Sequence, residues 1–378
     1  MRALRFHSLF IFLAIFFPTL VFASGDRLIL NAKINGESIR LAFDTGTPTP
    51  FTILSPTAQK LSLKTEQRKE GKYAFFTLYI EGYEIVNAQA LIIDSLPFPD
   101  IDGLVGWPAL WGSIWRVQWE NMSLSLMSSI PTEILSWQSL KLDTQIPIAA
   151  VWIFENSNGL LYLDTGHSGG IALTEFHWNK WIKENSHLPR TLKSGYLPAA
   201  GGIFSTELTW AKSFKLGFLE IPCVIMEKNV FRWERLEAVL GIEALKHFNI
   251  VFDLISGKVY LKERPYSLRN FRYNRLGATF LPSSLESDSL VGHVLKNTPA
   301  YQAGLRSGDI LMKVDNIDMT KWRSDPEIWK KVFWEAKPGT KYIIQVERNG
   351  KKLLFPVTLG EILAIPFCEK NRKTKKAD

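Results

Sequence analysis

Two short motifs place residues capable of acid–base chemistry in this sequence. Asp44-Thr45-Gly46 and Asp164-Thr165-Gly166 each put a carboxylate in front of a threonine and a glycine. Two carboxylates held about 3 Å apart cannot both ionise cheaply, so they share a proton, and one can act as a base while the other acts as an acid. Glycine allows close approach of the backbone, and the two threonines can brace the loops. The motifs therefore predict one reactive pair, Asp44 and Asp164.

The surroundings of the two triplets are also alike, which reveals an internal repeat. An Asn-Gly pair, typical of hairpin turns, precedes an apolar strand and the triplet in 35–46 and again in 158–166. A Gly-x-x-Ala-Leu segment follows in 104–110 and in 239–245. A lone Asp-Thr-Gly would more often be an ordinary turn, but the matched copies favour a reactive pair. We expect two mainly β lobes, residues 26–130 and 143–263.

The segments LAFDTGTPTP with LVGWPAL, and LYLDTGHSGG with VLGIEAL, resemble the two active-site segments of retropepsin-like and pepsin-like (clan AA) aspartic proteases. The resemblance implies a bilobal acid-protease double β-barrel with pseudo-twofold symmetry and an extended substrate in the cleft. It implies an aspartic-type endopeptidase, a hydrolase in which Asp44 and Asp164 activate water and cleave exported polypeptides. It also implies that no cofactor and no metal take part.

The same resemblance places flexible flaps over the cleft. Their best matches are Gly71 and Tyr73 in the first lobe and Gly201 and Gly202 in the second. In such proteases the flaps cover a substrate that lies between the lobes.

The residues that follow the triplets, Thr47-Pro48 and His167-Ser168, depart from the family pattern. Thr47 can hydrogen-bond the outer oxygen of the first carboxylate, and Ser168 can do the same for the second. His167 either lies near the pair and shifts its working pH, or points to solvent, which we favour. The departures leave an alternative, a non-catalytic peptide-binding adaptor (pseudoprotease). A serine-type mechanism is not expected, although residues 166–170 (GHSGG) have the Gly-x-Ser-x-Gly spacing.

The segment NTPAYQAGLRSGDILMKVDNIDM resembles the core of the PDZ domains of bacterial proteases. The resemblance implies a PDZ-like α+β domain over residues 265–361, which binds a peptide as an added strand at a sheet edge. The backbone amides of Leu276 and Gly277 would hold the carboxylate of a peptide C-terminus. Polypeptide substrates are the partners that such a domain would recruit or position.

The N-terminal residues have the features of a secretory signal peptide, 1–23. Arg2 and Arg5 precede an apolar run that ends in small residues before a cut after Ala23. An uncleaved membrane anchor is the alternative, although the run of about 14 apolar residues is shorter than the ~20 that span a bilayer. We expect an exported protein, periplasmic or secreted.

Charge and cysteine content narrow the partners further. The formal net charge of +8 lies partly in the basic tail 369–378, which we expect to be solvated and disordered and which could contact an anionic membrane surface. No basic segment is interleaved with aromatic residues, so a nucleic-acid partner is not expected. The two cysteines, Cys223 and Cys368, have no metal-binding spacing and could form a disulfide or stay free.

Overall fold

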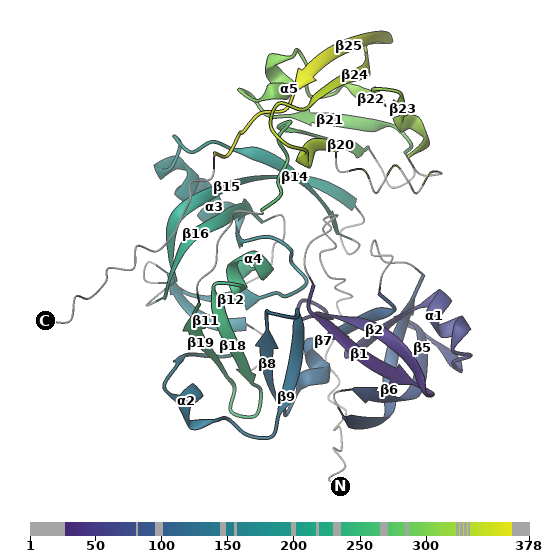
Figure 1. Cartoon of the computed structure of the whole chain (residues 1–378), viewed down its shortest axis with the longest axis vertical. Coiled ribbons are helices and arrows are strands. Elements are labelled where there is room, and N and C mark those ends of the chain that lie inside the picture. Colours follow the sequence, from purple (N-terminus) through teal and green to yellow (C-terminus); the bar gives the residue numbers. More distant parts are fainter. Residues whose placement is uncertain are drawn as a thin grey trace, which may run out of the picture.

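The computed structural model describes residues 27–80, 82–94, 101–143, 149–154, 157–197, 202–216, 219–229, 236–264, 271–283, 287–322, 325, 328, 331 and 333–364. The predicted signal peptide, the basic tail, Gly201 and Cys368 lie outside these residues. The described chain is mainly β and is arranged in four sheets (Figure 1). None of its described helices is long and apolar enough to cross a membrane.

Two seven-stranded sheets form what we call the first and second lobes. The first runs in the order β1-β2-β7-β3-β6-β5-β4 and the second in the order β11-β12-β17-β13-β16-β15-β14, so their strand orders correspond, and β1 of the first also pairs with β5. The pairs β2–β7 and β3–β6 are parallel, as are β12–β17 and β13–β16. The strands of the first lobe are β1 (Ile29–Ile34), β2 (Glu37–Asp44), β3 (Phe51–Leu54), β4 (Thr65–Arg68), β5 (Gly71–Ile80), β6 (Tyr83–Ile93) and β7 (Gly103–Gly106). Those of the second are β11 (Ala149–Phe154), β12 (Ser157–Leu163), β13 (Ile171–Leu173), β14 (Thr191–Leu197), β15 (Gly202–Leu216), β16 (Leu219–Lys228) and β17 (Leu236–Leu240).

The two Asn-Gly pairs have different roles. Asn35 and Gly36 both have positive φ, 53° and 83°, and form the tight turn between β1 and β2. The second pair is not the predicted turn, because Asn158 and Gly159 lie inside β12 and pair with β11. Gly159 is required there for space, since a Cβ would lie 1.9 Å from the Glu237 side chain.

A five-stranded sheet, β10-β19-β18-β8-β9, joins the two halves of the repeat, because β8 pairs with β18. One continuous hydrophobic core runs through both lobes and this sheet. The sheet's strands are β8 (Ile114–Gln118), β9 (Ser123–Met127), β10 (Gln138–Lys141), β18 (Phe248–Asp253) and β19 (Lys258–Glu263). The short helices around the lobes are α1 (Ser55–Lys60), η1 (Trp107–Leu110), α2 (Thr132–Leu135), α3 (Glu175–Glu184) and α4 (Ile242–Leu245).

The C-terminal sheet has its own core and packs beside β14 and β15 of the second lobe (Figure 1). At the junction the buried ring of Tyr273 clusters with apolar residues of β15 and β16, and the Trp210 indole donates a hydrogen bond to the Leu363 carbonyl (2.8 Å). The elements are β20 (Ala278–Pro282), β21 (Leu290–Val294), α5 (Pro299–Gln302), β22 (Ile310–Val314), β23 (Ile317–Asp318), η4 (Met319–Lys321), η5 (Phe333–Glu335), β24 (Lys341–Arg348) and β25 (Lys351–Thr358).

Candidate active site

The two triplets meet where the lobes face each other. Asp44 ends β2 and Asp164 follows β12, and both side chains are buried and hydrogen-bonded to each other. A Cβ on Gly166 would lie 2.2 Å from Asp44 Oδ1, and a Cβ on Gly46 would lie 2.8 Å from Asp164 Oδ1. Each glycine is therefore required because the opposite carboxylate passes directly over it.

Thr45 and Thr165 bind the two loops together through reciprocal hydrogen bonds. The amide of Thr45 donates to Thr165 Oγ1 (3.1 Å), and the amide of Thr165 donates to Thr45 Oγ1 (2.9 Å). Each hydroxyl in turn donates across the junction, from Thr45 to the Leu163 carbonyl (2.5 Å) and from Thr165 to the Phe43 carbonyl (2.9 Å). Four buried bonds thus fix the position of one triplet relative to the other.

The two carboxylates have different hydrogen-bond partners. Asp44 accepts from the Gly46 amide (2.8 Å) and the Thr47 hydroxyl (3.0 Å). Asp164 accepts only backbone bonds from its own loop, from the amides of Gly166 (2.9 Å) and His167 (3.1 Å). The structure therefore gives the first carboxylate a hydroxyl donor that the second does not receive from its own loop.

These surroundings give the two carboxyl groups of the pair different pKa values. Burial raises the pKa of Asp44 to about 6, against the Thr47 and Gly46 hydrogen bonds, which favour the ionised form. Burial and then the charge of Asp44 raise the pKa of Asp164 to about 8. Near neutral pH the pair therefore holds one proton, which belongs to the two coupled carboxyl groups together. Such a pair can deprotonate a water and protonate an oxygen or nitrogen at the same point.

His167 does not point to solvent, so that expectation is wrong. Its side chain is buried, and Nε2 lies 3.5 Å from Oε2 of Glu227, which is itself buried. Glu227 also accepts from Lys193 Nζ (3.0 and 3.2 Å) and from the Gly170 amide (3.2 Å). Burial would raise the pKa of Glu227, but the charges of Lys193 and His167 hold that pKa well below its usual value. The His167 ring can be buried because the charged carboxylate of Glu227 lies beside it and compensates its loss of contact with water.

This buried network was not expected from the sequence. Glu227 follows the apolar run CVIM in β16, and an acidic residue at the end of such a run signals a buried partner. Among the described residues, no group of three or more His, Cys, Asp or Glu side chains is placed to hold a metal ion.

The remaining candidate residues lie in several places. Ser168 Oγ is buried with no hydrogen-bond partner among the described residues, and Ser168 lines a cavity between the second lobe and the C-terminal domain. Gly71 begins β5 with a φ of 146°, Tyr73 is buried in β5, and Gly202 begins β15. A role as flaps stays a prediction for these residues.

The amides of Leu276 and Gly277 already have an acceptor within the chain. Both donate to Oδ1 of Asn274, at 2.9 and 3.0 Å, where we expected the carboxylate of a bound peptide. Gly277 has a φ of 75°, and a Cβ there would lie 2.3 Å from Thr298, so glycine is needed to shape this loop.

Comparison with known proteins identifies the C-terminal part of the chain. Residues 274–359 match the family model of the PDZ domain. The zinc metalloprotease RasP of Shouchella clausii is 33% identical over 73 residues, which are 19% of this chain and 16% of that protein. The serine endoprotease DegS of Haemophilus influenzae is 30% identical over 81 residues, 21% of this chain and 23% of that protein. The chain thus matches less than a quarter of the length of either relative.

The comparisons confirm the PDZ domain and correct the expected protease class. The matching proteases are named as serine and zinc enzymes, and the matching family model is that of the PDZ domain. The expectation of an aspartic-type endopeptidase of the retropepsin-like or pepsin-like family is contradicted by these matches. A resemblance in short segments around two triplets was too local to assign the class.

Proposed function

We propose that this chain is a PDZ-containing protease, a hydrolase that acts on polypeptides. The two matched relatives are both named as proteases, and the PDZ match covers most of the C-terminal domain. PDZ domains generally bind peptide C-termini or add an extended peptide to a sheet edge. The substrate class that agrees with both observations is a polypeptide, positioned with the help of the C-terminal domain.

We further propose that Asp44 and Asp164 form a buried acid–base pair in this chain, without assigning a catalytic class to it. The observation that carries this proposal is the pair itself, two buried carboxyl groups, each of which passes over the glycine of the opposite triplet. Buried titratable groups whose pKa values are driven apart are a physical signature of acid–base centres. The neighbouring groups that would support the pair are the hydroxyls of Thr45, Thr47 and Thr165 and the two close glycines.

Two further proposals accompany this function, one on the fold and one on the localisation. The identical strand orders of the two lobes support a bilobal double β-barrel with pseudo-twofold symmetry. The disulfide at Cys223 supports export to the periplasm or the medium, because disulfides persist in oxidising compartments.

The test is hydrolysis of an unfolded model protein, such as reduced casein, by the full chain. Asp44→Asn and Asp164→Asn should each lower the rate by at least about 100-fold, because general acid–base catalysis contributes about 10²–10⁴-fold. Glu37→Gln, an exposed acid-to-amide change at the start of β2, should keep the wild-type rate. Undiminished hydrolysis by either Asn variant would refute the role of the pair. A wild-type chain that cuts nothing between about pH 4 and 9 would refute the protease.

A further inference from the structure

In the loop before β20, the Asn274 side chain occupies the position where a ligand carboxylate would accept backbone hydrogen bonds. Oδ1 of Asn274 accepts the amides of Leu276 and Gly277, and Nδ2 of the same side chain donates to the Ala278 carbonyl (2.7 Å). Consecutive backbone amides that converge on one oxygen form the kind of concavity that binds a carboxylate. In this chain that position is taken by a neutral side-chain amide.

The second lobe holds this occupant in place. The buried Thr191 hydroxyl of β14 donates to the Asn274 carbonyl (2.5 Å). Thr279, the second residue of β20, forms a hydrogen bond between its Oγ1 and Ser205 Oγ of β15 (2.8 Å). Asn274 is therefore fixed by its side chain within the PDZ domain and by its backbone to the lobe. A ligand carboxylate could reach the two amides only by displacing bonds that are already made.

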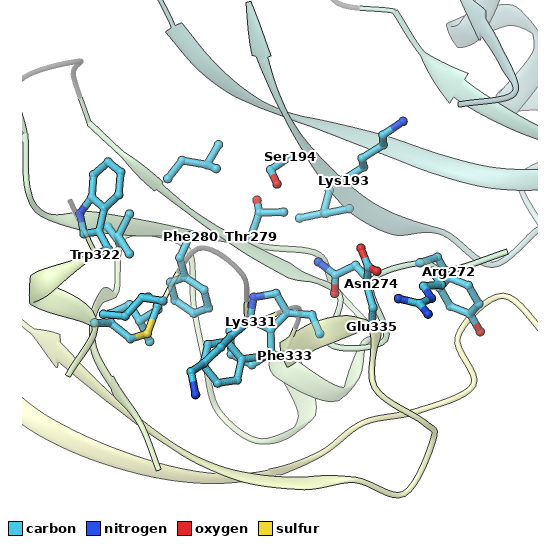
Figure 2. A pocket seen from close by; sticks show the side chains of 18 of the residues that line it. Lys193, Ser194, Arg272, Asn274, Thr279, Phe280, Trp322, Lys331, Phe333 and Glu335 are labelled. Carbon is cyan, nitrogen blue, oxygen red and sulfur yellow. The ribbon is translucent and has the colours of Figure 1, made fainter. Parts of the chain in front are cut away.

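A cavity of about 270 Å³ begins beside this loop and runs between β14 and the C-terminal domain (Figure 2). Figure 2 shows Asn274 near Arg272 and Glu335, with Phe280 and Trp322 farther along the cavity. Its apolar lining includes Leu281, Leu311 and Ile328. The cavity thus offers room for an apolar side chain beside a carboxylate site that is closed.

We infer that Asn274 is a built-in substitute for a ligand carboxylate, which removes any preference of this PDZ domain for a free C-terminus and lets it bind an extended internal segment of a polypeptide. An internal segment brings no terminal charge, so it does not need the two amides, and its apolar side chain can enter the cavity. The inference rests on the proposed function only in taking the ligand to be a polypeptide.

The test compares two forms of one probe on the full chain. A short fluorescein-labelled peptide that ends in phenylalanine is made with a free C-terminal carboxylate and with a C-terminal amide. Binding is followed by fluorescence anisotropy, which requires no hydrolysis, so its outcome is separate from that of the protease proposal. The wild-type protein should bind the two forms with dissociation constants within about 2-fold of each other.

Asn274→Ala removes the substitute and should create about a 10-fold preference for the free carboxylate, or about 1.4 kcal/mol. Asn274→Asp is the matched control, since it keeps an acceptor oxygen, adds a negative charge and should gain no such preference. Near-ultraviolet circular dichroism checks that both variants fold.

Two outcomes would overturn the inference. One is an Asn274→Ala protein that folds and shows no preference for the carboxylate. The other is a wild-type protein that already prefers the carboxylate by 10-fold or more, and this measurement needs no variant.

Discussion

Replacing Asp164 by Asn should make the fold more stable at alkaline pH. Burial and the charge of Asp44 raise the pKa of Asp164 from 3.8 to about 8. Between these values the folded protein keeps a proton that the unfolded chain has released, so the free energy of unfolding falls as pH rises. About four pH units at about 1.4 kcal/mol each give a loss of about 6 kcal/mol above pH 8. Asparagine keeps the shape and carries no charge, so it avoids this loss.

The assay is urea denaturation of the full chain at pH 5 and pH 9, followed by tryptophan fluorescence, with any transition of the C-terminal domain analysed separately. Movement of the loop and entry of water reduce the cost of a buried charge, so we expect wild type to lose at least about 2 kcal/mol more than Asp164→Asn. Glu37→Gln should follow wild type, because its side chain is exposed. Equal losses in wild type and Asp164→Asn would refute the reasoning.

Three further predictions concern the pair and its supports. Hydrolysis should peak between about pH 6 and 8, because the pair lacks a base below this range and an acid above it; a rate that still rises at pH 9 would exclude a shared proton. Thr45→Ala should lower the free energy of unfolding by about 1–3 kcal/mol, since the buried Thr165 amide loses its acceptor, and Thr45→Ser should restore most of it in urea denaturation. Lys193→Met should lower the free energy of unfolding by about 1–3 kcal/mol, because the buried Glu227 then keeps only His167 and the Gly170 amide as partners, and adding Glu227→Gln should recover stability; a double variant as unstable as the single would count against the network.

The contact between the two triplets could be predicted from the sequence because the strand, triplet and Gly-x-x-Ala-Leu segment occur twice. Matching strands before each triplet and matching Gly-x-x-Ala-Leu segments after it fix equivalent positions in two lobes, and these become β2 with β7 and β12 with β17. A repeat constrains tertiary structure in a way that one motif cannot. The protease class could not be predicted in this way, because assigning it needs similarity over a whole domain. The PDZ family model matches residues 274–359, and the two relatives match over 73 and 81 residues.

Two of the errors have different origins, one in partners that are distant in sequence and the other in a local contact. His167 was expected in solvent because histidine is often exposed, but Glu227 and Lys193 come from two other strands and compensate it in the interior. The acceptor for the Leu276 amide was likewise expected from a ligand, although it lies two residues away in Asn274. An asparagine that bonds backbone amides two and three residues ahead is a known turn pattern, so this contact could have been read from the sequence.

Two copies of one motif do not make two equal carboxylates. The triplets are identical, and the grip between their threonines is reciprocal, so the difference must come from the residue that follows each glycine. Thr47 adds a hydroxyl donor to Asp44, whereas His167 gives Asp164 only its backbone amide and turns its ring toward Glu227. The donor stabilises the charge on Asp44, and that charge then raises the pKa of Asp164. The departures after the triplets are therefore the features that give the two carboxyl groups different hydrogen-bond donors.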